Sequence, residues 1–261
     1  MKEGTRKVAL VTGAARGIGL ATAKRFLADN WRVALLDIDR DTLDRTHATL
    51  PSDQVIAICC DVADPGGVGD AVALVEQKLG RLDALVNNAG IAIFKPILEL
   101  TFEDWSRVLA VNLTGPFLCV QAAAPLMSDS GGGAIVNITS ISGLRASTLR
   151  TAYGTSKAAL AHLTQQQALE LASVGIRVNA VAPGPVDTAM AKAVHTPEIR
   201  AAYHDAIPLN RYGLERELAE MIFFLCSDRA SYVTGQTIAV DGGFEAAGIG
   251  LPALRKEGRN T

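Results

Sequence analysis

The chain lacks an excess of charge of either sign. Its 25 lysines and arginines nearly balance its 27 aspartates and glutamates, and the formal net charge is −2. No basic cluster predicts a nucleic-acid partner, and no acidic tail predicts a strongly charged one. Long apolar runs are also absent, since the longest are of strand length, far short of the roughly 20 residues that span a bilayer. Residues 1–7 are polar and contain no apolar signal-peptide core. We therefore expect a cytoplasmic protein with no membrane partner.

Cysteine is scarce. The four cysteines are Cys59, Cys60, Cys119 and Cys226. Cys59 and Cys60 are neighbours in an apolar strand-like run, so their side chains should point to opposite faces. None of the four has the spacing of metal ligands. We expect four small core residues in a reducing compartment and no metal site.

Apolar strand-like runs alternate with helical patterns along the chain. Strands are predicted over residues 8–11, 33–36, 55–58, 84–86, 134–138, 177–181 and 237–240. Helices are predicted over residues 20–30, 42–50, 68–79, 102–127 with a bend near Pro116, 152–173 and 217–226, while 187–216 is irregular. Continuous apolar strands indicate a sheet that is covered on both faces. Strand-helix alternation indicates parallel pairing through right-handed crossovers.

The predicted fold class is therefore α/β: a single-domain, Rossmann-like, doubly wound parallel sheet with helices on both faces. The core should span residues 7–244, with a substrate lid at about 188–212 and a tail at 245–261. Ligands of such sheets bind at the carboxyl ends of the strands. Asp37, Asp61, Asn88, Ser140 and Pro183 all fall at or just past those ends, which predicts one site there.

A glycine-rich turn follows the first strand and opens the first helix. Its glycines are Gly13, Gly17 and Gly19, in the spacing Gly-x-x-x-Gly-x-Gly. Glycines let the backbone turn tightly and approach a pyrophosphate, and the helix N-terminus offers free N–H groups to the anion. A simple strand-to-helix turn is the alternative interpretation.

Asp37 ends the second strand, twenty residues after Gly17. A carboxylate at this place can accept hydrogen bonds from both adenosine ribose hydroxyls, and it would repel a 2′-phosphate. Arg16 favours the phosphate instead, whereas Ile38 leaves the position after Asp37 without a cation. We therefore predict NAD rather than NADP. A helix-capping role for Asp37 is the alternative.

Tyr153 and Lys157 are four residues apart, so their side chains share one face of a helix. A positive charge about 4 Å from a phenol contributes about 4 kcal/mol at an effective dielectric near 20. That is enough to lower the phenol pKa by about 2–3 units. Tyr153 could then exchange a proton with an alcohol oxygen while a hydride is transferred, and Ser140 could hydrogen-bond the same oxygen. An ordinary exposed helix pair is the alternative.

These motifs together resemble the short-chain dehydrogenase/reductase family over residues 7–244. The matching segments are residues 12–19, 61–62, 87–90, 112, 140, 153–157, 177–179 and 183–188. The resemblance implies a catalytic set of Asn112, Ser140, Tyr153 and Lys157. In the family pattern Asn112 supports a water in a proton relay, and Lys157 also binds the nicotinamide ribose. A homotetramer, or a homodimer, is implied as well.

The resemblance also implies the remaining cofactor contacts. Asp61 and Val62 should flank adenine, and Thr188 should contact the nicotinamide amide. The full expected set is Gly13, Arg16, Gly17, Ile18, Gly19, Asp37, Ile38, Asp61, Val62, Asn88, Ala89, Gly90, Tyr153, Lys157, Pro183, Gly184, Val186 and Thr188.

Substrate specificity should lie in residues 91–94, 142–151 and 190–211. The expected substrate contacts are Ser140, Ser142, Arg150 and Tyr153. Arg150 precedes Tyr153 by three residues, on roughly the same helix face, where a guanidinium could pair with a carboxylate. A surface or subunit-interface arginine is the alternative. His195 and His204 are expected to be solvated lid side chains.

The predicted function is interconversion of a secondary alcohol and a ketone by hydride transfer with NAD(H), on a sugar, polyol or hydroxy acid. The nearest alternative is an NADPH-dependent 3-oxoacyl-thioester (acyl carrier protein) reductase, which Asp37 opposes. An isomerase or lyase with transiently used NAD and a nucleotide-sensing protein without catalysis are more distant alternatives.

Overall fold

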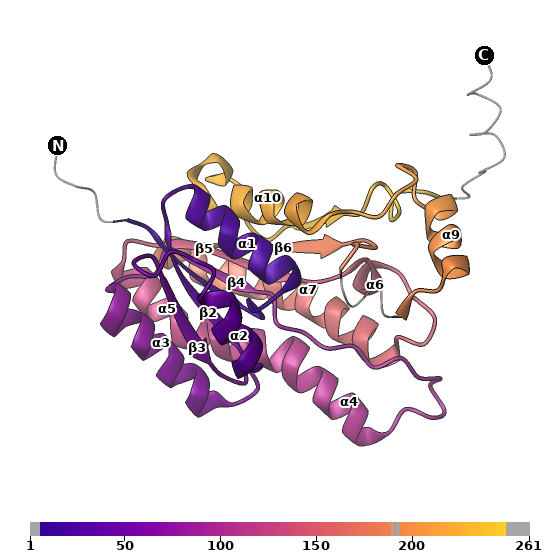
Figure 1. The fold of residues 1–261 in the computed structure, drawn as a ribbon, viewed down its shortest axis with the longest axis horizontal. Coiled ribbons are helices and arrows are strands. Elements are labelled where there is room, and N and C mark those ends of the chain that lie inside the picture. Colours follow the sequence, from indigo (N-terminus) through magenta and orange to yellow (C-terminus); the bar gives the residue numbers. More distant parts are fainter. Residues whose placement is uncertain (1–5, 189–190, 192–193, 249–261) are drawn as a thin grey trace, which may run out of the picture.

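Seven parallel strands form the centre of the computed structural model, which describes residues 6–188, 191 and 194–248 (Figure 1). Their order in the sheet is β3-β2-β1-β4-β5-β6-β7. The strands are β1 Val8–Thr12, β2 Arg32–Asp37, β3 Val55–Cys59, β4 Ala84–Asn87, β5 Gly133–Ile138, β6 Ile176–Pro183 and β7 Thr237–Val240. Each predicted strand is present, with ends within two residues of those expected. The predicted doubly wound α/β fold is confirmed.

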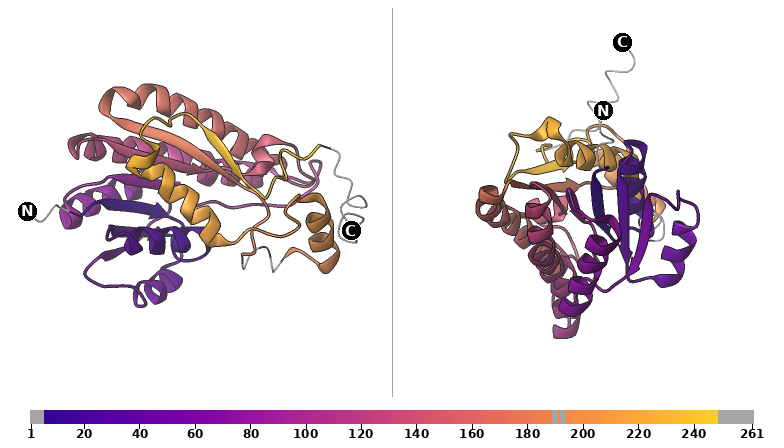
Figure 2. Two further views of the ribbon diagram at one scale, coloured as in Figure 1. Left: turned by 90° about the horizontal axis from the view of Figure 1, so that it is seen from above. Right: turned by 90° about the vertical axis from the view of Figure 1, so that its left-hand side faces the viewer.

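Alternate residues of each strand point into two different cores. In β1, Val8 and Leu10 join one core, while Ala9 and Val11 join the other, and all four are buried. Helices α3 (Pro65–Leu79), α5 (Gly115–Asp129) and α7 (Thr151–Leu171) contribute to the first core. Helices α1 (Gly17–Ala28), α2 (Arg40–His47) and α10 (Glu215–Cys226) contribute to the second. The two views of Figure 2 show these groups of helices on opposite sides of the sheet. Burial on both faces explains why the strands read as continuous apolar runs.

The chain reverses its direction of travel across the sheet between β1 and β4. It first moves outward from β1 to β2 and β3, and then returns to place β4 on the other side of β1. The crevice at this switch point lies beyond the carboxyl ends of the two strands, which is where ligands of open α/β sheets bind. The glycine turn after β1 and the Asn-Asn pair at the end of β4 therefore meet there.

Two helical predictions need correction. The predicted helix over residues 102–127 is divided into α4 (Phe102–Leu109), a π-helical turn η1 (Ala110–Thr114) and α5. The interruption lies just before Pro116, which occupies the first turn of α5, whereas Pro125 lies inside the same helix. The segment predicted as irregular contains helix α9 (Pro197–Ala206), and a short helix α6 (Ile141–Leu144) precedes α7. Short 3-10 turns lie at Ala172–Val174 and Asp228–Ala230.

The stretch Phe102–Asp129 is long and apolar enough to cross a membrane by length and composition alone, which the sequence reading did not anticipate. In this structure it packs against α3, α7 and the sheet, and 44% of its most apolar window is buried there. A core helix of a soluble protein passes the same test. The cysteine prediction holds for Cys60, Cys119 and Cys226, which are free and buried, while Cys59 is free and half-buried.

Candidate active site

The glycine turn has a backbone that other residues would strain. Gly13 and Gly17 have φ values of 62° and 61°, in the left-handed region. A Cβ atom on Gly19 would lie 2.2 Å from the Gly13 carbonyl oxygen, so a side chain there would collide with the turn. Helix α1 begins at Gly17 with no side-chain cap and no acidic residue in its first turn. The free N–H groups and the positive end of the helix dipole therefore suit a pyrophosphate.

Asn88 braces this turn from the neighbouring strand. Its Nδ2 atom donates hydrogen bonds to the carbonyl oxygens of Thr12 (2.9 Å) and Gly13 (3.0 Å). In return, the Thr12 hydroxyl accepts from the backbone N–H groups of Asn88 and Ala89, each at 3.0 Å. Four bonds thus join the ends of β1 and β4 across the switch point and fix the shape of the turn.

The Asp37 carboxylate lies at the end of β2, where it is only 8% exposed. Its Oδ2 atom accepts from the Ala15 N–H, and its Oδ1 atom accepts from the Asp39 N–H, each at 3.0 Å. Two ionised oxygens have about four acceptor positions, so capacity remains for ribose hydroxyls. Arg16 is paired with Asp39 beside it. The neighbouring Ile38 side chain is exposed.

Asp61 and Val62 follow β3, further along the same edge of the sheet. Asp61 accepts from the Ala63 N–H at 2.9 Å and from the Arg107 guanidinium at 3.2 Å. Val62 is buried against Gly115. A Cβ atom on Gly115 would lie 2.9 Å from the Val62 Cγ2 atom. Neither residue lines the cavity that contains Tyr153 and Lys157, and the same is true of Gly13, Gly19, Asp37, Ile38 and Ala89.

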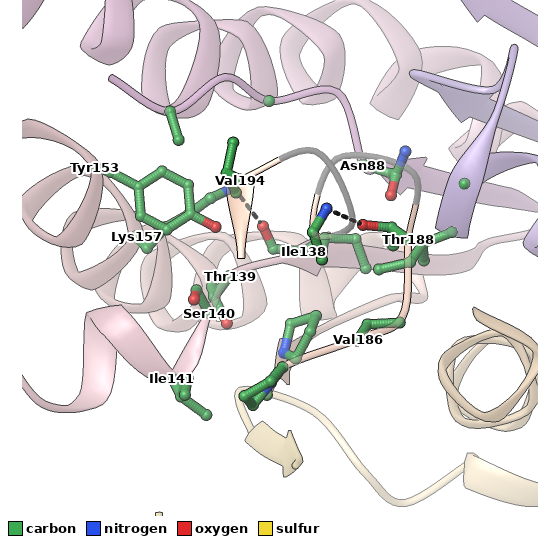
Figure 3. A pocket seen from close by; sticks show the side chains of 18 of the residues that line it. Asn88, Ile138, Thr139, Ser140, Ile141, Tyr153, Lys157, Val186, Thr188 and Val194 are labelled. Atoms are coloured by element: carbon green, nitrogen blue, oxygen red, sulfur yellow. Dashed lines mark hydrogen bonds between the residues drawn. The ribbon is translucent and has the colours of Figure 1, made fainter. Parts of the chain in front are cut away.

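A cavity of about 340 Å³ opens beside the glycine turn (Figure 3). Figure 3 shows Tyr153, Lys157 and Ser140 on one side, with Asn88, Thr188 and Val186 on the other. The predicted residues on its wall are Arg16, Gly17, Ile18, Asn88, Gly90, Ser140, Arg150, Tyr153, Lys157, Pro183, Gly184, Val186 and Thr188. The wall also contains Ile138, Thr139, Ile141, Pro185 and Glu215, which were not predicted, and Ala191, Val194, His195 and Tyr203, which lie in the segment 190–211 predicted to carry specificity.

The tyrosine, lysine and serine come together because the carboxyl end of β5 lies beside the first turns of α7. Ser140 follows β5 and caps α6, with its Oγ atom accepting from the Ser142 N–H at 3.1 Å. Tyr153 lies in the first turn of α7, and Lys157 lies one turn later. The Lys157 Nζ atom donates to the Ile138 carbonyl oxygen at 2.7 Å, and it lies 5.8 Å from the centroid of the Tyr153 ring.

Burial dominates the pKa values of this pair. It lowers the pKa of the Lys157 ammonium to about 8. It also raises the pKa of the Tyr153 phenol, although a hydrogen bond from Ser140 and the charge of Arg150 act in the opposite direction. In the protein without cofactor, the pKa of the Tyr153 phenol is therefore raised, and the lowering by Lys157 that the sequence predicted is not seen. The lysine donates a hydrogen bond to a backbone carbonyl, and its charge is not among the causes that lower the phenol pKa.

Asn112 lies behind the cavity wall, fully buried in the π-helical turn η1. Its amide clamps Ile91: Oδ1 accepts from the Ile91 N–H and Nδ2 donates to the Ile91 carbonyl, both at 2.9 Å. A Cβ atom on Gly90 would lie 3.2 Å from Asn112 Oδ1 and 3.4 Å from Lys157 Nζ. The asparagine and the lysine thus approach the same point, and a side chain at Gly90 would require Asn112 to shift. Single π-helical turns within helices are frequent at functional sites.

Arg150 and Ser142 differ in their access to the cavity. Arg150 lines the wall, with its guanidinium 5.0 Å from the centroid of the Phe94 ring. Ser142 is buried outside the wall, where its hydroxyl lies 3.2 Å from that of Ser147 and 3.4 Å from Arg150 Nη1. Ser142 therefore reaches the cavity through Arg150 rather than directly.

Both lid histidines are half-buried rather than solvated as expected. His195 lies on the cavity wall, and His204 packs against the Tyr212 ring at 5.6 Å between centroids. Glu215 at the start of α10 was not foreseen as a wall residue. Its carboxylate lies beside Gly17, with Oε1 3.8 Å from the position of a Cβ atom there. No local motif marks either residue, because both reach the cavity only through the tertiary fold.

Comparison with known proteins agrees with this geometry. The family model described as enoyl-(acyl carrier protein) reductase matches residues 13–245. The chain is 42% identical to 2-(R)-hydroxypropyl-CoM dehydrogenase of Xanthobacter autotrophicus, over 92% of this chain and 99% of that protein. It is also 42% identical to a 3-oxoacyl-(acyl-carrier-protein) reductase of Thermotoga maritima, over 91% and 97% of the two chains. The solved structure of a candidate gluconate dehydrogenase from Agrobacterium tumefaciens superposes with a TM-score of 0.89 at 34% identity, over 92% and 96% of the chains. The chain belongs to the short-chain dehydrogenase/reductase family and is an oxidoreductase that interconverts an alcohol and a ketone with a nicotinamide cofactor.

Proposed function

We propose that this chain is an NAD(H)-dependent dehydrogenase of a small hydroxy acid, with Asn112, Ser140, Tyr153 and Lys157 as its catalytic set. The observation that carries the proposal is that Arg150 shares one cavity wall with Tyr153 and Ser140. A guanidinium on this wall can bind a carboxylate bidentately while the carbinol oxygen of the same molecule faces the phenol. Neutral sugars and polyols would leave that cation without a partner in the substrate.

The chain's own residues handle the proton. When bound, a nicotinamide would supply the hydride acceptor for oxidation of the carbinol carbon and the hydride donor for reduction of the ketone. Tyr153 takes the hydroxyl proton during oxidation and gives it back during reduction. Ser140 hydrogen-bonds the same substrate oxygen and fixes its position. Lys157, held near Asn112 at Gly90, supplies a positive charge beside the phenol and a path by which the proton can leave.

The preference for NAD rests on the surroundings of Asp37. Its carboxylate has acceptor capacity for ribose hydroxyls and would repel a 2′-phosphate. Arg16 is the cation that favoured NADP in the sequence, but the structure pairs it with Asp39. Its charge is therefore already partly neutralised. We propose that every cofactor contact expected from the sequence is made, including the contacts of residues that do not line the cavity. The glycine turn and the ends of β2 and β3 lie along one edge of the sheet, so one extended cofactor could reach all of them.

The rival function is reduction of a 3-oxoacyl thioester with NADPH. The Thermotoga maritima relative favours it, and Asp37 together with the Arg16–Asp39 pair opposes it. We also propose that the protein is a cytoplasmic homotetramer formed by a single domain, whose residues 188–212 act as a substrate lid.

The test is steady-state reduction of NAD and NADP, followed at the nicotinamide absorbance. The substrates are 3-hydroxybutyrate and gluconate, each beside its neutral amide, and a neutral polyol. We expect turnover of an acid with NAD. In Arg150→Ala the KM of the acid should rise about tenfold or more, because a charged hydrogen bond is lost, while the KM of the amide stays unchanged. An equal rise for acid and amide would exclude the carboxylate contact. A preference for NADP would exclude the role of Asp37 in selecting NAD. It would then favour the rival function, reduction of a 3-oxoacyl thioester.

A further inference from the structure

His195 lines the same cavity as Arg150 and Tyr153, and its ring packs against Tyr203, which also lines the cavity, and Tyr212, which does not. Its Nδ1 atom lies 3.0 Å from the Tyr212 hydroxyl. Its ring lies 5.3 Å from that of Tyr203, at an interplanar angle of 30°, and 5.9 Å from that of Tyr212. Tyr212 is only 5% exposed and does not line the cavity. The Nδ1 edge of the imidazole therefore faces the protein interior.

Tyr212 and Tyr203, which contact the His195 ring, are themselves held by other residues. The Arg200 guanidinium lies 4.3 Å from the centroid of the Tyr212 ring and donates to Asp187 at 2.9 Å. Tyr203 also packs against Phe244, at 5.9 Å between centroids. Such an arrangement holds an imidazole in one orientation. The Nε2 atom makes no hydrogen bond to any residue in the described part of the chain, so the ring keeps one polar atom for a ligand.

The Tyr212 hydroxyl can donate to Nδ1 of a neutral imidazole or accept from the Nδ1–H of an imidazolium. With Tyr212 donating to Nδ1, a neutral imidazole carries its hydrogen on Nε2, where it can be donated into the cavity. Burial together with the charges of Arg150 and Arg200 lowers the pKa of His195, which favours the neutral form near pH 7. The other titratable groups around it are the phenols of Tyr203 and Tyr212, with His204 beyond Tyr212.

We propose that His195 is a second anchor for the anionic group of the substrate, and that this group is bound between Arg150 and His195 Nε2. The inference rests on the proposed function and narrows its substrate class to short hydroxy acids. A carboxylate beside the imidazole favours the imidazolium, which donates from Nδ1 to the Tyr212 hydroxyl, so binding of the acid takes up a proton. The acid then binds more tightly at pH 6 than at pH 8, since two cations face it at the lower pH.

The experiment is titration calorimetry of the NADH-saturated enzyme with 3-hydroxybutyrate. Enzyme-bound NADH and a hydroxy acid are both reduced, so no hydride transfer occurs and binding is measured alone. Titrations at pH 7 in two buffers of different ionisation enthalpy give the number of protons taken up. We expect uptake of a fraction of a proton per site in the parent protein and none with 3-hydroxybutyramide.

His195→Gln keeps an N–H donor but cannot be protonated. We expect it to bind the acid about tenfold more weakly and to take up no proton. Tyr212→Phe, which removes only the orienting hydroxyl, should lose part of the affinity. His204→Gln is the matched control, because His204 also packs on Tyr212 but does not line the cavity. It should behave as the parent protein does.

Three outcomes would overturn the inference: equal affinity in His195→Gln, proton uptake that persists in that variant, or no binding of the acid. These outcomes are separate from failure of the proposed function. That failure would appear as no oxidation of a hydroxy acid with NAD in the kinetic assay, whereas the calorimetry requires no turnover.

Discussion

Lys157→Met should abolish activity and yet raise the stability of the protein at neutral pH. Burial lowers the pKa of this ammonium from 10.5 to about 8. At about 1.4 kcal/mol per pKa unit, holding the charge in the fold costs about 3 kcal/mol below pH 8. Methionine fills a similar volume without that charge. It also removes the 2.7 Å bond to the Ile138 carbonyl, and an unsatisfied buried carbonyl costs about 1–3 kcal/mol.

The expected net gain is therefore about 1 kcal/mol at pH 7, or about 2–4 °C in Tm for a chain of this size. The pH dependence distinguishes this explanation from better packing. Between pH 8 and 10.5 the unfolded chain binds more protons at this lysine than the folded chain does, so the parent protein gains stability as pH rises. The methionine variant lacks that gain. Its advantage should be complete below pH 8 and should reverse as the pH approaches 10.5.

Urea unfolding of both proteins at pH 7 and pH 9.5, followed by circular dichroism, measures the difference directly. Lys24→Met on α1 is the matched control, since Lys24 is an exposed helix lysine and its replacement should show little dependence on pH. A Lys157→Met variant that is less stable than the parent by the same amount at both pH values would refute the reasoning.

Two further changes test other parts of the site. Tyr153→Phe should lower kcat by about 10²–10⁴-fold because the proton-transferring group is lost, while NADH titration by fluorescence shows unchanged affinity; activity within tenfold of the parent would contradict this role. Gly19→Ala should weaken NADH binding at least about tenfold, because the new Cβ atom would lie 2.2 Å from the Gly13 carbonyl and a well-packed site tolerates added atoms poorly. Gly69→Ala on α3, where nothing lies within 4 Å of the added atom, serves as its control and should leave NADH affinity unchanged.

The strands and the positions of the main motif residues could be predicted from sequence because both depend on local patterns. Apolar runs mark the strands, and the spacing of Tyr153 and Lys157 marks one face of a helix. Helix α9 also had a local signal that was not used: Thr196 caps it by accepting from the Ile199 N–H, and Pro197 occupies its first turn.

Other features depend on the tertiary fold and leave no local pattern. His195 reaches the cavity because Tyr212, seventeen residues later, holds its ring. The raised pKa of Tyr153 follows from burial by several elements, which a residue spacing does not report. Asn112 was found through family resemblance, and its clamp on Ile91 requires a π-helical turn that no propensity indicates.

The brace between Asn88 and Thr12 has a consequence for the order of folding. These residues are 76 positions apart, so their bonds can form only after the chain has closed a long loop through β2, β3 and α3. A growing chain that has reached residue 60 contains every glycine of the nucleotide turn but nothing to hold its carbonyls. The anion-binding turn therefore acquires its shape only when β4 docks beside β1, and an amino-terminal fragment that ends before β4 would carry the motif without the binding site.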